Sequence, residues 1–320
     1  MRGLRLNLGG YQMSNLRDAL GLRAPYGKTN TQFETEFDPA SGTVWGFFNP
    51  GGNACFSLGL LKDIRTHDGA LETNAGHVLF EGAMHKANYY VVGSRVPRVF
   101  NLGGDLALFV LLIKSRDREA LAHYAKLCID NVYPRVRNYN CPALTTISLV
   151  QGDALGGGFE CALSSDVLIA EESAVMGLPE ILFNLLPGMG AYSLLARRIG
   201  MRAAESLILS GKMLTAAKLH EMGVIDVLAK DGEGEAAVGQ WIHANRKRRN
   251  GYAAVYRARQ CVHPVTREEL DSIAEVWVDA ALRLEDRDLK MMGRLVRSQM
   301  RRMDGEAVSD ITEEALAATG

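Results

Sequence analysis

The chain has little cysteine, almost no net charge and no long apolar run. Its five cysteines form no CxxC pair and no regular spacing, which excludes a disulfide framework and predicts reduced thiols. A net charge of −1 provides no general attraction to nucleic acid or acidic membranes. No apolar run approaches the roughly 18 residues of a membrane span, and residues 1–7 lack the unbroken apolar core of a signal peptide. We therefore expect a cytoplasmic protein that neither binds nucleic acid nor inserts into a membrane.

Motifs for metals and nucleotides are absent too. The seven histidines are scattered without HxxH or HExxH spacing, so no metal is predicted. The three glycines at 156–158 do not fit GxGxxG, and Lys212 lacks the surroundings of a phosphate-binding loop. Ser164 and Ser165 do not lie in the GxSxG turn of a serine hydrolase. These absences argue against a metal site, a nucleotide-binding loop and a serine-hydrolase triad.

Strands alternate with helices through the middle of the chain, which predicts an α/β core with parallel strands. The sequence also predicts a hairpin at 32–48 and a Ser57-capped helix. Buried strands are predicted at 88–94, 144–150 and 166–170, and helices at 105–137, 191–199, 203–210 and 215–222.

Changes in composition divide the chain into four parts. We expect a poorly ordered arm at 1–30, a core at 31–230, a helical carboxy-terminal subdomain at 231–302 and a mobile tail at 303–320. The subdomain is inferred from a helical period over 267–300, which follows a polar break at 230–235.

Two glutamates twenty positions apart are the candidate catalytic groups. Glu160 closes the glycine-rich segment 152–160, and Glu180 follows Pro179 in the segment 177–180. A carboxylate among apolar and small residues loses hydration, which raises its pKa toward a value useful for proton transfer. Together the two side chains can act as an acid–base pair on one substrate.

Two glycine turns are candidates for binding a negatively charged oxygen. In each, an extended segment leads through glycines into a helix: Gly103 and Gly104 in one, residues 156–158 in the other. The first N–H groups of a helix lack intrahelical partners and point outward. The bare backbone at Gly156 and Gly157 leaves room for a thioester carbonyl, so two such turns can form an oxyanion hole.

These segments resemble the crotonase (enoyl-CoA hydratase/isomerase) superfamily. The resemblance is carried by residues 152–160, 177–180 and 187–190 and extends over 88–228. It implies an α/β fold, with a crotonase-like ββα spiral core and a helical carboxy-terminal subdomain. It also implies assembly as a homotrimer or a dimer of trimers.

Within the superfamily, the chain is most similar to bacterial diffusible-signal-factor synthases. The similarity extends over 50–302 and is carried by the segments 100–106, 154–160, 176–180, 187–193 and 274–279. It implies dehydration of a 3-hydroxyacyl chain on acyl carrier protein to a cis-2-enoyl chain. Thioester hydrolysis then releases a cis-2-unsaturated fatty acid, a quorum-sensing signal. No dissociable cofactor is expected, because the oxyanion hole and the two carboxylates suffice.

The resemblance also implies roles for individual residues. Gly104 and Gly157 supply the oxyanion N–H groups, Glu180 removes the C2 proton, and Glu160 protonates the departing 3-hydroxyl. The reverse assignment of the glutamates stays open, because two interacting carboxylates titrate as a pair. The substrate-binding residues implied are Leu155, Gly156, Met189, Trp277 and Leu295. Unlike ordinary hydratases, which have Ala-Gly before the donor glycine, this chain has Leu102-Gly103.

The expected partners are acyl carrier protein and the receiver domain of a cognate sensor kinase. Carrier proteins are acidic, and two basic runs are candidate docking faces: residues 246–249, and the helical side formed by Arg294, Arg297, Arg301 and Arg302. Two alternatives stay open. In the first alternative, the chain is a CoA-linked hydratase or isomerase. In the second, it acts mainly by binding the sensor kinase. Acyl chain length and the role of the arm are not predictable from the sequence.

Overall fold

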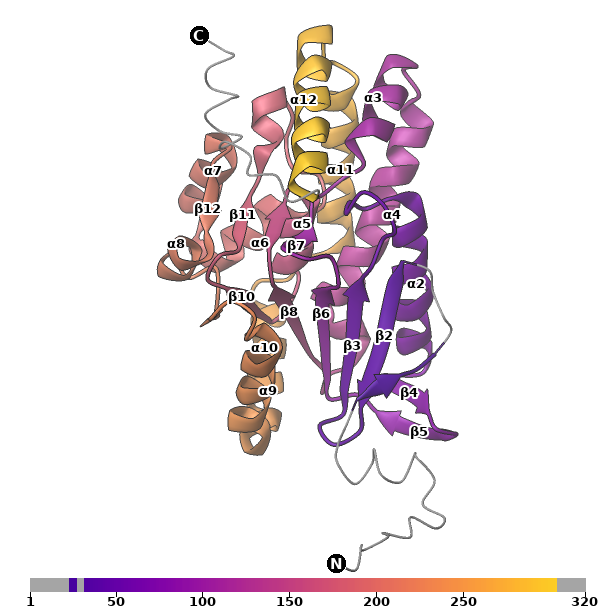
Figure 1. Cartoon of the computed structure of the whole chain (residues 1–320), viewed down its shortest axis with the longest axis vertical. Helices are drawn as coiled ribbons and strands as arrows, with labels where there is room; N and C mark the ends of the chain where they lie inside the picture. Colours follow the sequence, from indigo (N-terminus) through magenta and orange to yellow (C-terminus); the bar gives the residue numbers. More distant parts are fainter. Residues whose placement is uncertain (1–22, 28–31, 304–320) are drawn as a thin grey trace, which may run out of the picture.

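The computed structural model describes residues 23–27 and 32–303. It is built around a seven-stranded sheet (Figure 1). The strand order is β1-β2-β3-β6-β8-β10-β13. β1 and β2 pair antiparallel, as do β2 and β3, whereas every pair from β3 to β13 is parallel. The bounds are β1 (Ala24–Pro25), β2 (Phe33–Asp38), β3 (Thr43–Phe48), β6 (Tyr89–Ser94), β8 (Thr145–Val150), β10 (Val167–Glu171) and β13 (Val227–Ala229).

A second sheet has four strands in the order β12-β11-β9-β7. From β6 to β11, strands of the large and the small sheet alternate along the chain. The large-sheet strands β6, β8 and β10 are each followed directly by a small-sheet strand and then by helix. This repeat confirms the crotonase-like ββα spiral. The small-sheet strands are β7 (Val99–Asn101), β9 (Asp153–Leu155), β11 (Val175–Gly177) and β12 (Met213–Thr215); β4 (His77–Phe80) and β5 (Ala83–Lys86) form a separate hairpin.

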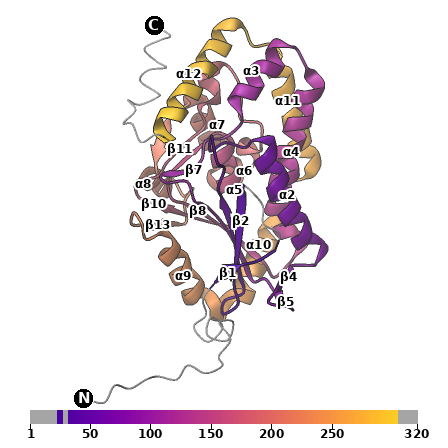
Figure 2. The ribbon, with the colours of Figure 1, turned by 45° about the vertical axis from the view of Figure 1, so that its right-hand side comes forward.

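The large sheet is buried on both faces. Every residue of β3, β6, β8 and β10 is buried, as expected for parallel strands covered by helices. Helices α2 (Leu58–Thr73) and α4 (Arg118–Val136) lie on one side, and α9 (Gly234–Asn245) lies on the other (Figure 2). Packing on two faces fixes the ends of the strands, and the candidate site lies near those ends.

Local signals explain where several helices begin. The Ser57 hydroxyl accepts a 3.1 Å hydrogen bond from the Leu60 N–H, which confirms the predicted cap of α2. The single helix predicted at 105–137 is wrong, since α3 (Leu106–Lys114) and α4 are separate. Arg116 has a φ of 55°, and the Asp117 carboxylate caps α4 through the Ala120 N–H. The apolar period continues through this break, so periodicity alone did not reveal it.

The carboxy-terminal region folds back over the core as helices. Helix α11 (Arg267–Ala281) packs on α4, and α12 (Asp286–Met303) packs on α3. The predicted arm lies outside the described residues except for 23–27, and the predicted tail lies outside them except for Met303. The remaining helices are α5 (Gly157–Leu163), η2 (Pro179–Phe183), α6 (Ala191–Ile199), α7 (Met201–Ser210), α8 (Ala216–Glu221) and α10 (Arg249–Val262), with short turns η1 (Asn138–Asn140) and η3 (Arg246–Arg248).

Candidate active site

The two predicted glycine turns lie against each other. Strands β7 and β9 run parallel and pair Asn101 with Ala154, so their following turns emerge side by side. Gly103 has a φ of 91°, and a β-carbon on it would lie 3.1 Å from the backbone nitrogen of Gly157. Among the described residues, neither the Gly104 N–H nor the Gly157 N–H has a hydrogen-bond acceptor. Two adjacent, uncommitted donors are the components of an oxyanion hole.

Glu160 is held by the amino terminus of a helix from the next turn of the spiral. Its Oε1 accepts hydrogen bonds from the N–H groups of Met189 at 2.7 Å and Ala191 at 2.8 Å. Gly190 adopts a φ of 114° and begins α6, so these N–H groups can converge on one oxygen. The side chain is 1% exposed. Burial raises the pKa of Glu160 to about 7, although the backbone N–H groups oppose that shift.

Glu180, in contrast to Glu160, has a carboxylate oxygen without a hydrogen-bond donor in the described part of the chain. It lies in η2 directly after Pro179, and its Oε2 is buried without a hydrogen-bond partner among the described residues. Burial, and then the nearby charge of Glu160, raise the pKa of Glu180 to about 8, although its own backbone N–H lowers it. A buried, unsatisfied carboxylate oxygen costs stability, and such groups are concentrated where function requires them.

Both glutamates and both donor glycines line one small cavity of about 50 Å³. That volume is enough for one or two water molecules, since a water occupies about 30 Å³ of liquid. An acyl chain therefore needs side chains of the wall to move. The lining residues are Gly104, Leu106, Phe109, Tyr124, Ala125, Cys128, Gly157, Glu160, Glu180, Phe183, Leu185, Gly188, Met189 and Trp277.

Two of the predicted substrate-binding residues form a wall of this cavity. The indole of Trp277 lies over Gly188, where an added β-carbon would be 2.7 Å from the ring. The thioether of Met189 lies 2.6 Å from the position of a β-carbon on Gly157. Met189 therefore touches the oxyanion turn itself, and its flexible side chain is suited to yielding to a substrate.

The other three predicted substrate-binding residues lie differently. Gly156 is next to the Glu180 carboxylate, and a side chain there would collide with it. The side chain of Leu155 packs into a small cluster with Ala54, Val99 and Leu102. Leu295 is buried in the main core, on α12, and is not part of the cavity lining. The substrate contacts of all five residues remain predictions.

Sequence reasoning missed two aromatic residues of the cavity. Phe109 packs edge-on against Tyr124 at 4.9 Å between ring centroids and against Trp277 at 5.0 Å. The Tyr124 hydroxyl donates to the Phe56 carbonyl at 2.5 Å and accepts from the Asp105 N–H at 3.2 Å, which fixes the chain directly after Gly104. Tyr124 lies one helical turn before Cys128, and that shared stripe was the only signal of its position.

Within residues 23–27 and 32–303, no group of three or more His, Cys, Asp or Glu side chains is arranged to hold a metal ion. The same part of the chain contains no helix long and apolar enough to cross a membrane. The five cysteines are free thiols.

The ββα spiral, the paired glycine turns and the buried glutamates define a protein of the crotonase superfamily. A sequence model of the enoyl-CoA hydratase/isomerase family matches residues 84–272, more than half of the chain. The chain belongs to this family of enzymes.

Curated relatives include the mitochondrial methylglutaconyl-CoA hydratase of Mus musculus. It is 36% identical over 153 residues, which cover 48% of this chain and 46% of the relative. The mitochondrial enoyl-CoA hydratase domain-containing protein 2 of the same organism is 45% identical over 93 residues, which cover 29% and 31%. The chain thus spans less than half the length of these relatives.

Solved structures share the fold at low sequence identity. DspI of Pseudomonas aeruginosa matches with a TM-score of 0.61 and 23% identity, covering 79% of this chain and 96% of that one. An enoyl-CoA hydratase from Bacillus halodurans matches with a TM-score of 0.68 and 18% identity, covering 83% and 100%. At these identities the likeness establishes the common fold.

Proposed function

We propose that the protein dehydrates a 3-hydroxyacyl chain on acyl carrier protein to the cis-2-enoyl thioester and then hydrolyses the thioester. The product is a cis-2-unsaturated fatty acid that serves as a quorum-sensing signal. One observation carries the proposal: two buried carboxylates and two uncommitted N–H groups line a single, mostly apolar cavity. The sequence similarity to diffusible-signal-factor synthases supports the choice of substrate and product.

In the dehydration step, the thioester carbonyl oxygen accepts hydrogen bonds from the N–H groups of Gly104 and Gly157. One carboxylate removes the C2 proton, and the N–H pair stabilises the resulting enolate. The other carboxyl group protonates the 3-hydroxyl, which leaves as water while the C2–C3 double bond forms. Removing one oxyanion donor costs roughly 2.7–4 kcal/mol of transition-state stabilisation in well-studied enzymes, so two donors can supply much of the required acceleration.

The hydrogen bonds of the site support a particular division of labour. The N–H groups of Met189 and Ala191 stabilise the ionised form of Glu160. Glu180 has no comparable donor to Oε2 among the described residues and is also repelled by the Glu160 charge. A single shared proton therefore prefers Glu180. This favours Glu160 as the base and Glu180 as the acid of the elimination, the reverse of the assignment that the resemblance implies.

Hydrolysis can use the same groups. After elimination, a carboxylate deprotonates a water that attacks the thioester carbonyl, and the tetrahedral oxyanion occupies the position of the enolate oxygen. Collapse of this intermediate breaks the C–S bond. The carrier thiolate receives the proton from the same carboxyl group, so no cofactor enters the balance.

A basic stripe beside the site supports an acidic carrier. Lys290, Arg294 and Arg297 are exposed along α12, and α12 packs against η2, which carries Glu180. Carrier proteins are acidic, so this stripe provides charge complementarity. The resemblance further supports a homotrimer or dimer of trimers, a cytoplasmic location, and the receiver domain of a sensor kinase as a second partner.

The test is incubation of the purified protein with 3-hydroxydodecanoyl-acyl carrier protein. Products are separated against cis and trans standards and identified by mass spectrometry. We expect free cis-2-dodecenoic acid, lost in both single Glu→Gln variants. Failure to turn over this substrate, with reversible hydration of trans-2-enoyl-CoA, would make the protein an ordinary hydratase. A Glu160→Gln/Glu180→Gln variant that still signals in cells would favour the sensor-kinase-binding role.

A further inference from the structure

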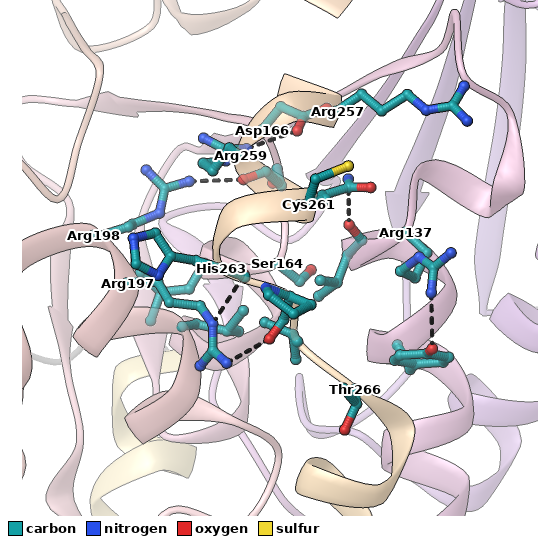
Figure 3. Close-up of a pocket in the computed structure, with 18 of the residues that line it drawn as sticks. Arg137, Ser164, Asp166, Arg197, Arg198, Arg257, Arg259, Cys261, His263 and Thr266 are labelled. Carbon is teal, nitrogen blue, oxygen red and sulfur yellow. Dashed lines mark hydrogen bonds and ion pairs between the residues drawn. The ribbon is translucent and has the colours of Figure 1, made fainter. Parts of the chain in front are cut away.

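A second, larger cavity lies away from the glutamates. Its volume is about 480 Å³, within the range of roughly 300–1,000 Å³ typical of small-molecule sites. The end of α4, the end of α5, helix α6 and the segment 257–266 enclose it, and its lining shares no residue with that of the glutamate cavity (Figure 3). The proposed reaction assigns this cavity no role.

Five arginines line this cavity, and three of them have carboxylate partners. Arg197 and Arg198 lie on one side in Figure 3, and Arg137 and Arg257 lie on the other. The ion pairs join Arg197 to Glu269 at 2.8 Å, Arg198 to Asp226 at 3.4 Å and Arg259 to Asp166 at 2.8 Å.

Two arginines retain uncompensated charge. Among the residues described, Arg257 has no hydrogen-bond or ion-pair partner, and Arg137 bonds only the Tyr133 hydroxyl, at 3.2 Å. The cavity lining contains two carboxylates, Asp166 and Glu268. Asp166 pairs with Arg259, whereas the exposed Glu268 pairs with none of the five arginines in the described part of the chain. Arg137 and Arg257 also line a second hollow, of about 200 Å³.

The rest of the lining is suited to an organic body. Leu163, Leu194 and Val265 are buried apolar residues of the same cavity. A planar guanidinium binds phosphate or carboxylate oxygens through two parallel hydrogen bonds. The two arginines without a carboxylate partner among the described residues carry two positive charges, one more than a single carboxylate would neutralise. A phosphate group carries close to two negative charges and therefore fits better.

We propose that this arginine cavity binds a small organic phosphate, with the phosphate between Arg137 and Arg257 and the organic part against the apolar wall. The ligand would also affect the active site. Helix α6 begins at Ala191, which donates to Glu160, and carries Arg197 and Arg198 into the arginine cavity. Helix α5 likewise extends from Gly157 at the oxyanion turn to Leu163 in the arginine cavity.

The test measures binding directly, so it does not depend on the proposed reaction. Isothermal titration calorimetry with ADP is carried out on the full chain and on Arg137→Ala/Arg257→Ala. The control, Arg202→Ala/Arg283→Ala, makes the same charge change at exposed arginines outside the cavity lining. We expect ADP to bind the full chain and the control equally, and the cavity variant at least about tenfold more weakly, since each charge-assisted hydrogen bond contributes strongly.

Further titrations distinguish the sources of the phosphate. Orthophosphate or pyrophosphate binding as tightly as ADP would overturn the organic part of the proposal; weaker binding supports it. The proposal fails if ADP does not bind the full chain, if the cavity variant binds ADP as well as the control does, or if dodecanoate binds there in preference to ADP. A change in molar mass of the cavity variant by light scattering would instead make the cavity a contact between copies of the chain and would also overturn the proposal.

Discussion

The backbone N–H of Ala191 donates a 2.8 Å hydrogen bond to Oε1 of Glu160, although the two residues are 31 positions apart. The Glu160 carboxylate, on one turn of the spiral, is thus positioned by the first helical residue of the next turn. Because Oε2 of Glu180 has no comparable hydrogen-bond donor in the described chain, the two glutamates differ electrostatically even though burial raises the pKa of both.

Replacing either glutamate by glutamine should abolish turnover without unfolding the protein. Loss of a positioned acid or base costs about 10²- to 10⁴-fold in rate. Glutamine has nearly the same shape, and at position 180 it keeps the uncharged state that the raised pKa of about 8 favours at neutral pH. We expect an unchanged or higher melting temperature for Glu180→Gln. Product formation by mass spectrometry, together with a thermal melt, checks this, and a variant retaining half of the wild-type rate would rule out an essential role.

The division of labour predicts a difference in isotope exchange. If Glu160 removes the C2 proton, Glu180→Gln still exchanges C2 hydrogen with deuterated water, and Glu160→Gln does not. Mass spectrometry of the recovered 3-hydroxyacyl thioester measures the exchange. The opposite pattern would restore Glu180 as the base.

The rate of dehydration should have a bell-shaped pH dependence. Burial raises the pKa of Glu160 to about 7 and that of Glu180 to about 8, so one shared proton is present mainly between these values. Activity falls toward lower pH as both carboxyls become protonated, and toward higher pH as both ionise. A kcat/KM profile from pH 5 to 10 tests this, and activity that is flat from pH 5 to 7 would contradict it.

The same raised pKa values should make folding stability fall with rising pH. Between the unfolded value of 4.5 and about 8, the folded chain holds more protons than the unfolded chain, so ionisation favours unfolding over that interval. A tenfold change in an ionisation constant corresponds to about 1.4 kcal/mol of unfolding free energy. Urea unfolding at pH 5 and pH 8.5 should therefore show a smaller loss of stability in Glu160→Gln/Glu180→Gln than in the wild type.

A methyl group on Gly157 should impair the oxyanion hole by displacing Met189. The added carbon would lie 2.6 Å from the Met189 sulfur, and overpacking of this kind costs about 1–3 kcal/mol. We expect roughly a tenfold or greater drop in kcat for Gly157→Ala. Partial recovery in Gly157→Ala/Met189→Ala would show that the clash with Met189 is the cause, whereas no recovery would point to the backbone itself.

Reversing the charge of the α12 stripe should affect carrier-bound substrates selectively. We expect Lys290→Glu/Arg294→Glu to lower kcat/KM for the acyl carrier protein substrate by at least about tenfold, since charge complementarity governs encounter. The corresponding acyl N-acetylcysteamine thioester, which has no protein surface, serves as the control substrate. Equal losses with both substrates would attribute the effect to the fold or the site and not to docking.

The sequence predicted which glutamates and glycines line the cavity better than it predicted the rest of the wall. Gly104, Gly157, Glu160 and Glu180 lie in short segments whose strand–glycine–helix order is visible along the chain. Phe109 was missed because its place depends on ring contacts with Tyr124 and Trp277, which are distant in the sequence.

Side-chain direction explains the remaining differences. Leu155 precedes the oxyanion turn, but alternation along β9 directs its side chain into the separate cluster with Val99. The break at Arg116 was hidden because Leu112 and Leu121 continue the apolar stripe on either side of it.

Trp277 is the last residue of the cavity lining to be synthesised. The residues that line the cavity come from four separate stretches of the chain, which the ribosome synthesises in the order 104–128, 157–160, 180–189 and 277. A nascent chain that stops before α11 already contains both glutamates but lacks the indole that covers Gly188. Water would then reach the carboxylates, and their pKa values would return toward those of ordinary glutamates. We therefore expect proton transfer at neutral pH only once α11 has been synthesised and has folded back over Gly188.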